Sequence, residues 1–159
     1  MSGVDHRAVL ECLQQKKDLF AQYEDCTSKL SLCEIEAMNH YITQRGILAK
    51  QIDKLDREID GYCDLASDPD LMRDAVANHG NYGDFPRDLQ IVYDKASEIF
   101  THINHIYNME AQIKKRMETE RDELMKKVKA GQGTAKVYNY VKNLSQGTQN
   151  GVYLGNQKI

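Results

Sequence analysis

Two long stretches of the chain carry apolar residues at alternating spacings of three and four, which is the pattern of an amphipathic α-helix. In the longer stretch, over residues 88–129, ten of the twelve seam positions are apolar, and Glu110 and Glu120 are the exceptions. The seam consists of Leu89, Val92, Ala96, Ile99, Ile103, Ile106, Glu110, Ile113, Met117, Glu120, Leu124 and Val128. A seam of this length predicts a single helix of about 40 residues, roughly 60 Å long at 1.5 Å per residue.

Local signals mark both ends of this helix. Pro86 precedes it, and Asp88 is its predicted N-cap, because a carboxylate accepts hydrogen bonds from the first backbone N–H groups of a helix. Gly131 and Gly133 are predicted to end it, because glycine readily adopts the left-handed conformation that follows many helices.

A second seam predicts another long helix, over about 31–62. Its apolar positions are Ile35, Met38, Ile42, Leu48, Ile52, Leu55, Ile59 and Tyr62. Ser31 and Glu34 have the spacing of a capping box, so this helix is predicted to begin near Ser31. A further helix is predicted from about 4 to 28, and the pattern leaves open whether the chain turns near 27–31 or continues as one rod.

Residues 63–87 are the predicted connection between the two long helices. Asp68-Pro69 is a helix-start signal, and Asn78 to Gly80 is a stop signal, so a short helix is expected between them. Such a connection favours an antiparallel helix pair over a continuous parallel coiled coil. We therefore predict an all-α, elongated antiparallel helical bundle over 1–130, with shorter flanking helices. A hinge, a short amphipathic helix and a flexible basic tail are predicted over 131–159.

Composition indicates where such a protein works. No apolar run approaches the roughly 18 residues that a membrane span needs, and the first residues lack the apolar core of a secretory signal. The four cysteines form no C-x-x-C pair, which is typical of reduced thiols in a helix core. We expect a cytoplasmic protein without membrane insertion.

Charge is distributed unevenly along the chain. Residues 126–159 contain six lysines and no acidic residue, while residues 1–125 contain 15 basic and 24 acidic residues, a balance of −9. This asymmetry predicts a basic tail that meets either its own acidic body or an acidic partner.

The motifs of several enzyme classes are absent from the sequence. Gly131 to Lys136 lacks the order of a phosphate-binding loop, and no histidine follows a glutamate at the Glu-x-x-His spacing of di-iron bundles. His102 and His105 share a predicted helix face with Glu98, but they flank seam residues and are expected to be a boundary pair. We predict no enzyme activity, no catalytic residues, no metal and no cofactor. Nucleic-acid binding is not favoured, because the basic tail has no arginine.

The C-terminal segment holds the candidate binding residues. Val137, Tyr138, Val141 and Leu144 form an apolar stripe on the predicted short helix. The stripe either caps the bundle or binds a partner by helix-in-groove packing, and the sequence leaves both open. The full candidate set for client or partner binding is Val137, Tyr138, Tyr140, Val141, Leu144, Tyr153 and Leu154.

The stretch from Glu34 to Ile59, preceded by the helix that contains Leu19 to Thr27, resembles the FlgN-like family of flagellar export chaperones, of which the FliT type is a near relative. The order of predicted helices also resembles that family. The resemblance implies a cytoplasmic type III secretion chaperone that binds the amphipathic C-terminal helix of a hook-associated filament protein. It also implies that a C-terminal tyrosine, Tyr138 or Tyr140 here, contacts a component of the export gate.

A structural coiled-coil adaptor or dimerisation module, without chaperone activity, is the alternative that the same pattern allows. The identity of the client stays open, and so does the oligomeric state, for which a homodimer is one arrangement.

Overall fold

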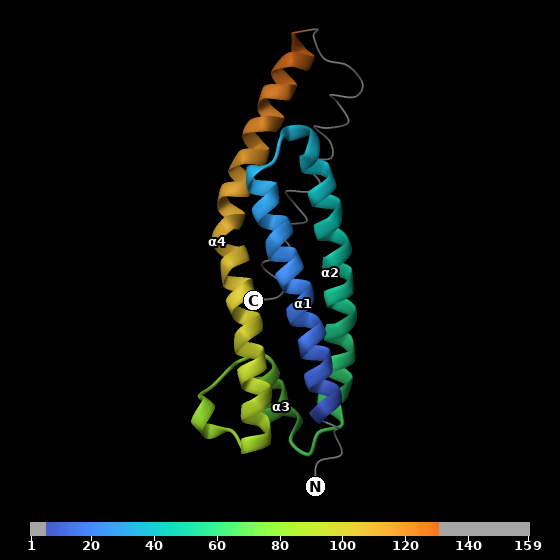
Figure 1. Cartoon of the computed structure of the whole chain (residues 1–159), viewed down its shortest axis with the longest axis vertical. Helices are drawn as coiled ribbons and strands as arrows, with labels where there is room; N and C mark the ends of the chain where they lie inside the picture. Colours follow the sequence, from blue (N-terminus) through green and yellow to red (C-terminus); the bar gives the residue numbers. More distant parts are fainter. Residues whose placement is uncertain (1–5, 131–159) are drawn as a thin grey trace. The chain divides into compact units, whose positions relative to one another are not determined.

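The computed structural model describes residues 6–130, and α-helices account for nearly all of them (Figure 1). The helices are α1 (His6–Leu32), α2 (Ile35–Asp64), α3 (Pro69–Val76) and α4 (Arg87–Lys129), and a 3-10 turn, η1, covers Tyr82–Asp84. No strand occurs within the described residues. Because the helices pack against one another through buried apolar faces, the predicted all-α helical bundle is confirmed. The hinge, short helix and tail predicted over 131–159 lie outside the described residues.

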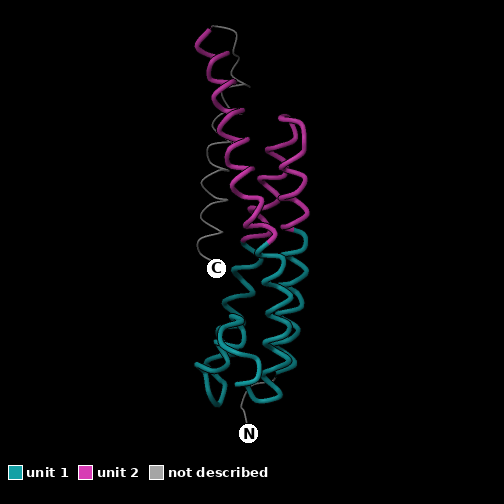
Figure 2. The backbone as a smooth tube through the Cα atoms, turned by 90° about the vertical axis from the view of Figure 1, so that its left-hand side faces the viewer, with its two compact units in different colours: residues 1–22, 50–104 teal, residues 23–49, 105–159 magenta. Residues whose placement is uncertain are grey.

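The chain divides into two compact units (Figure 2). Unit 1 contains residues 1–22 and 50–104, and unit 2 contains residues 23–49 and 105–159. Each of α1, α2 and α4 therefore contributes one segment to each unit, whereas α3 and η1 belong to unit 1 alone.

Unit 1 is built around apolar side chains from α1, α2, α3 and α4. Its buried residues include Val9, Leu13, Phe20, Ile52, Ile59, Cys63, Met72, Ala75, Phe85, Val92 and Ile99. Polar contacts at the edges define the helix directions: Lys16 of α1 pairs with Asp56 of α2 at 2.7 Å, and Cys12 Sγ lies 3.9 Å from the Glu58 carboxylate. From Cys12 to Lys16 the residue number rises along α1, while that of the partner falls from Glu58 to Asp56 along α2. These two segments are therefore antiparallel.

Unit 2 contains a core cluster of four buried side chains, Leu30, Met38, Ile113 and Met117, from α1, α2 and α4. Six partly buried residues pack around this core: Cys33, Ile35, Tyr41, Ile42, Met109 and Leu124. Met38, Ile113 and Met117 of the core, and Ile35, Ile42 and Leu124 around it, come from the two predicted seams, whereas Leu30, Cys33, Tyr41 and Met109 do not.

The α1–α2 boundary corrects two sequence predictions. Residues 4–28 and 31–62 were the expected helices, but α1 continues to Leu32 and α2 begins at Ile35. Ser31 is not a capping residue of α2, because it lies in the last turn of α1 and its hydroxyl donates to the Ser28 carbonyl at 2.6 Å. Burial of Leu30 in the unit 2 core accounts for the longer α1, since the helix must persist to bring this side chain inward.

The other helix ends follow the prediction more closely. Asp68 caps α3 by accepting from the Leu71 N–H at 3.1 Å, and Pro69 occupies the first turn. α4 begins at Arg87, directly after Pro86, as expected. However, Asp88 is not its N-cap: it lies inside the first turn, and the Pro86 carbonyl accepts from the backbone N–H groups of Leu89 and Gln90.

Candidate functional site

In unit 2, α4 continues past the turn between α1 and α2 (Figure 1). Arg116 marks the point where it passes, because its guanidinium donates to the Leu30 carbonyl at 2.9 Å and also to the Cys33 carbonyl. Leu30 lies in the last turn of α1 and Cys33 directly follows the helix. The last four carbonyls of a helix lack partners within it, so donors from elsewhere can satisfy them. The α4 residues after Met117 therefore extend beyond the level at which α1 ends.

Apolar side chains gather at this end of unit 2. Leu32, in the last turn of α1, is 84% exposed, and Ile35 at the start of α2 is half-buried. Leu124 packs against the unit 2 core, and Val128 lies one turn further along the same face of α4. We call Leu32, Ile35, Leu124 and Val128 the turn-end surface. One exposed leucine and several half-buried apolar side chains at the same end of a unit are the composition expected of a surface on which another helix packs.

A buried polar cluster lies in the same unit. Arg45 of α2, only 6% exposed, donates from Nη2 to the Glu110 carboxylate at 2.5 Å and to the Tyr23 hydroxyl at 2.9 Å. The guanidinium carbon also lies 4.8 Å from the centre of the Tyr23 ring. Three helices are thus joined by one arginine, because α1, α2 and α4 each contribute one member.

Burial shifts the acid–base behaviour of this cluster. Burial raises the pKa of the Glu110 carboxyl above its ordinary value, although the Arg45 guanidinium acts in the opposite direction. Burial also raises the pKa of Tyr23 to about 12, again against the effect of Arg45. Among the described residues, no buried side-chain nitrogen or oxygen lacks a hydrogen-bond partner. The cluster therefore links α1, α2 and α4 within unit 2.

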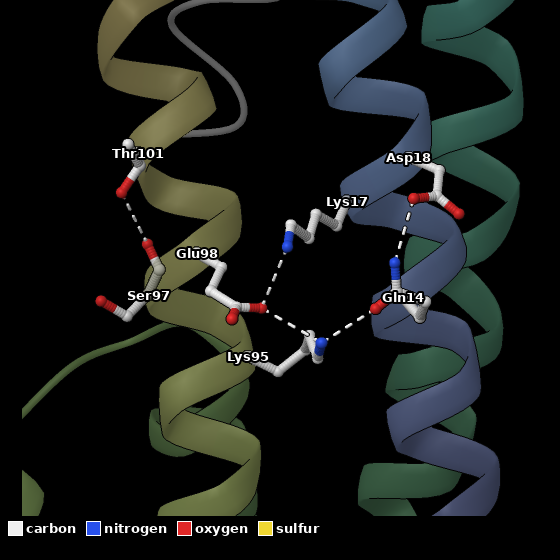
Figure 3. A network of polar contacts seen from close by, with 7 residues as sticks. All are labelled: Gln14, Lys17, Asp18, Lys95, Ser97, Glu98 and Thr101. Carbon is white, nitrogen blue, oxygen red and sulfur yellow. Dashed lines mark hydrogen bonds and ion pairs between the residues drawn. The ribbon is translucent and has the colours of Figure 1, made fainter.

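Unit 1 presents charged side chains between α1 and α4 (Figure 3). The Glu98 carboxylate lies 3.4 Å from Lys17 and 3.1 Å from Lys95, and Lys95 also donates to Gln14 at 2.8 Å. Hydrogen bonding from Lys95, with Lys17 adding to it, lowers the pKa of the Glu98 carboxyl. These side chains are at least a quarter exposed, so the network is a solvated edge that aligns the two segments in parallel.

An open groove also lies in unit 1, between α1 and α2, with a volume of about 390 Å³. Leu19 and Leu55 form its apolar part, and Asp18, Lys54 and Glu58 bring both signs of charge to it. Mixed charge on a shallow groove gives no convergent set of groups for a small molecule.

The histidines and cysteines considered from the sequence lie at separate places. His105 pairs with Glu24 of α1 at 3.1 Å, while Glu98 is engaged by Lys17 and Lys95. Across residues 6–130, no group of three or more His, Cys, Asp or Glu side chains is arranged to hold a metal ion. Cys12, Cys26, Cys33 and Cys63 are free thiols. Burial raises the pKa of the Cys12, Cys26 and Cys63 thiols. None of the helices from α1 to α4 is both long and apolar enough to cross a bilayer.

The structure does not test the binding residues that the sequence predicts. Val137, Tyr138, Tyr140, Val141, Leu144, Tyr153 and Leu154 all lie outside the described residues. The turn-end surface was missed, although the sequence contained a signal for it. The α4 seam is longer than the seam of the predicted helix over 31–62, so within residues 6–130 one end of α4 extends past that helix.

No protein-family model, curated protein or solved structure matches the chain.

Proposed function

We propose that this protein binds an amphipathic helix of another protein and acts as a cytoplasmic chaperone of flagellar type III secretion. The client class follows from the resemblance to FlgN-like chaperones, which implies the C-terminal helix of a hook-associated filament protein. The observation that supports helix binding is the turn-end surface, where α4 continues beyond α1 with partly buried Leu124 and Val128, and where Leu32 in the last turn of α1 is 84% exposed.

The mechanism we propose is helix-in-groove packing. The client helix lays its apolar face on the turn-end surface and on the stripe formed by Val137, Tyr138, Val141 and Leu144. Burying each such side chain contributes about 1.5–3 kcal/mol before ordering costs, which suits a dissociation constant in the micromolar range. Affinity of this order permits release, which a chaperone needs when it delivers its client. Tyr138 or Tyr140 then contacts the export gate, as the resemblance implies, and Tyr153 and Leu154 extend the contact with the partner.

The experiment is a titration of the full chain with a fluorescently labelled peptide that contains the C-terminal helix of a hook-associated protein. Leu32→Ser is the informative variant, because this side chain is 84% exposed and its loss removes almost no packing from the protein itself. We expect Leu32→Ser to weaken peptide binding about tenfold, and Leu124→Ser to weaken it further.

Ile91→Ser is the matched control, because Ile91 is 56% exposed and belongs to unit 1. It removes a similar apolar side chain and is expected to leave peptide binding unchanged. Equal binding by Leu32→Ser and Ile91→Ser contradicts the assigned surface. An obligate dimer in light scattering that binds no peptide favours the structural adaptor instead.

A further inference from the structure

A pocket in unit 1 adjoins the first turns of three helices, α1, α3 and α4, and has a volume of about 450 Å³. The residues that line it are His6, Ala66, Ser67, Asp68, Leu71, Met72, Pro86, Asp88 and Leu89. All of them belong to unit 1, so the pocket lies within one compact unit. We call it the helix-start pocket.

The helix-start pocket combines an apolar floor with a charged rim. Met72 and Leu89 line it and are buried, and Leu71 is half-buried. Asp68 and Asp88 also line it but are exposed. Buried lining residues form the deep part of a pocket and exposed ones its edge. A ligand that fits both parts therefore has an apolar body and a polar or charged end.

The two carboxylates of the rim keep capacity to accept hydrogen bonds. Asp68 Oδ1 accepts from the Leu71 N–H at 3.1 Å, as the N-cap of α3. Asp88 Oδ1 accepts from the Leu89 N–H at 3.0 Å, and its Oδ2 lies 3.4 Å from His6 Nε2. A carboxylate offers about four acceptor sites, so each can also bind a donor from a ligand.

The charge around the pocket favours a cation. None of the described residues that line it is a lysine or an arginine. Residues 64–94 contain seven aspartates and two arginines, a balance of −5, and Arg73 is already engaged by Asp60 at 3.1 Å and by Asp64. Helix starts attract anions through their free N–H groups, but at α3 and α4 the carboxylates of Asp68 and Asp88 already accept from such groups.

We propose that the helix-start pocket binds a lysine side chain of a partner protein. The apolar stem of the lysine lies on the floor of the pocket, and its ammonium group, with three donors, contacts Asp68 and Asp88 at the rim. Leu65, which directly precedes the lining residue Ala66, is 64% exposed, so apolar surface continues next to the pocket. This surface favours a protein, which presents an apolar neighbour beside its lysine, over a free amine.

This contact is separate from the binding of a client helix. The helix-start pocket belongs to unit 1 and the turn-end surface to unit 2, and the two share no residue. Failure of either proposal therefore leaves the other standing.

The test is an NMR titration of the isotope-labelled full chain with a short, end-blocked peptide that contains one lysine beside one leucine. We expect saturable shifts of backbone amides within 66–72 and 87–89, with a dissociation constant of about 1 mM, because one lysine stem and one leucine bury little apolar surface. The same peptide with norleucine in place of lysine keeps an apolar stem without the charge. It is expected to bind about tenfold more weakly.

Variants of the rim locate the contact. Asp68→Asn and Asp88→Asn each remove one negative charge and keep a side-chain oxygen, so α3 keeps its cap. Each is expected to weaken peptide binding about threefold, and the double variant about tenfold. Asp74→Asn is the matched control, because Asp74 is an exposed aspartate of α3 outside the lining of the pocket. It is expected to bind like the unaltered chain, and circular dichroism checks the helical content of each variant.

Several outcomes overturn the proposal. One is the absence of saturable shifts in these residues, and another is equal binding of the lysine and norleucine peptides. A third is peptide binding that the double variant leaves unchanged, because the contact then lies elsewhere. n-Pentylamine tests the source of the ammonium group: it is expected to bind more weakly than the lysine peptide, and equal affinity overturns the assignment to a protein partner.

Discussion

At the scale of single residues, the polar seam position Glu110 is explained by its partner. A carboxylate in an apolar seam is costly unless it is paired, and Arg45 supplies the charge together with a hydrogen bond to Tyr23. The sequence singled out Glu110 as an exception to the seam but could not identify its partner. Arg45 lies 65 residues away, and only the packing of α2 against α4 brings the two together.

We expect Glu110→Leu to lower the free energy of unfolding by about 3 kcal/mol, because it leaves the buried Arg45 guanidinium without its counter-charge. The double variant Arg45→Met/Glu110→Leu is expected to regain most of that loss, since no charge is then left buried. Urea unfolding of the two single variants and the double variant measures the coupling. Losses that simply add in the double variant would show that the two side chains do not act as a pair.

The raised pKa of Tyr23 predicts a specific alkaline transition. The folded state holds the Tyr23 proton up to about pH 12, whereas an unfolded tyrosine loses it near pH 10. Stability from this group is therefore fully present below pH 10 and decreases as the pH rises from 10 towards 12, by at most about 3 kcal/mol. Urea unfolding at a series of alkaline pH values measures the decrease. Tyr23→Phe should lack this part of the pH dependence, and a variant with the same alkaline slope as the unaltered chain would contradict the assignment.

At the scale of elements, the seams predicted which faces are buried, but they could not locate the break between α1 and α2. Capping-box spacing at Ser31 and Glu34 favoured a helix start there, yet packing of Leu30 into the unit 2 core prolongs α1 through Ser31. The end of α1 is stabilised by Arg116 from a distant part of the sequence, so no local signal could reveal it. By contrast, α3 was predicted well, because its start depends on the neighbouring Asp68 and Pro69 alone.

Arg116→Ala is expected to lower the free energy of unfolding by about 2 kcal/mol, because two backbone carbonyls lose a charged donor. Amide hydrogen exchange should quicken most in the last turn of α1 and the first turn of α2. Arg121→Ala is the control, since its ion pair with Asp122 at 3.5 Å lies on the exposed surface and is expected to contribute little. Similar exchange rates in the two variants would show that Arg116 does not hold the turn.

At the scale of the whole molecule, the sequence predicted the helical bundle, but the prediction did not include the turn-end surface, which lies within the described residues. The candidate stripe around Val137 is an apolar pattern that follows the glycines at 131 and 133, and both features are local in the sequence. The turn-end surface depends instead on the difference in length between α4 and the helices beside it in unit 2. Such a difference follows from where each helix ends, and helix ends are the least certain part of a sequence-based prediction.

Removal of residues 134–159 is expected to leave the helical content and the urea midpoint of the remaining chain nearly unchanged. Within residues 6–130, buried apolar side chains from Val9 to Met117 already pack the helices against one another. Binding of the labelled client peptide should fall sharply in the truncated chain, because the proposed stripe is lost. Circular dichroism during urea unfolding provides the first measurement and fluorescence anisotropy the second. A truncated chain that no longer unfolds cooperatively would show that the segment belongs to the core.

The hydrogen bond from Arg116 to the Cys33 carbonyl joins two residues that are 83 positions apart, so they are synthesised at different times. The ribosome makes the end of α1 about 4–17 s before it adds Arg116, at about 5–20 residues per second. Until Arg116 is added, the Leu30 and Cys33 carbonyls lack this donor. Leu30 and Met38 meanwhile lack the Ile113 and Met117 side chains that complete their core cluster for most or all of the same interval. A general holdase in the cell therefore has its best chance to bind this protein before translation reaches the second half of α4.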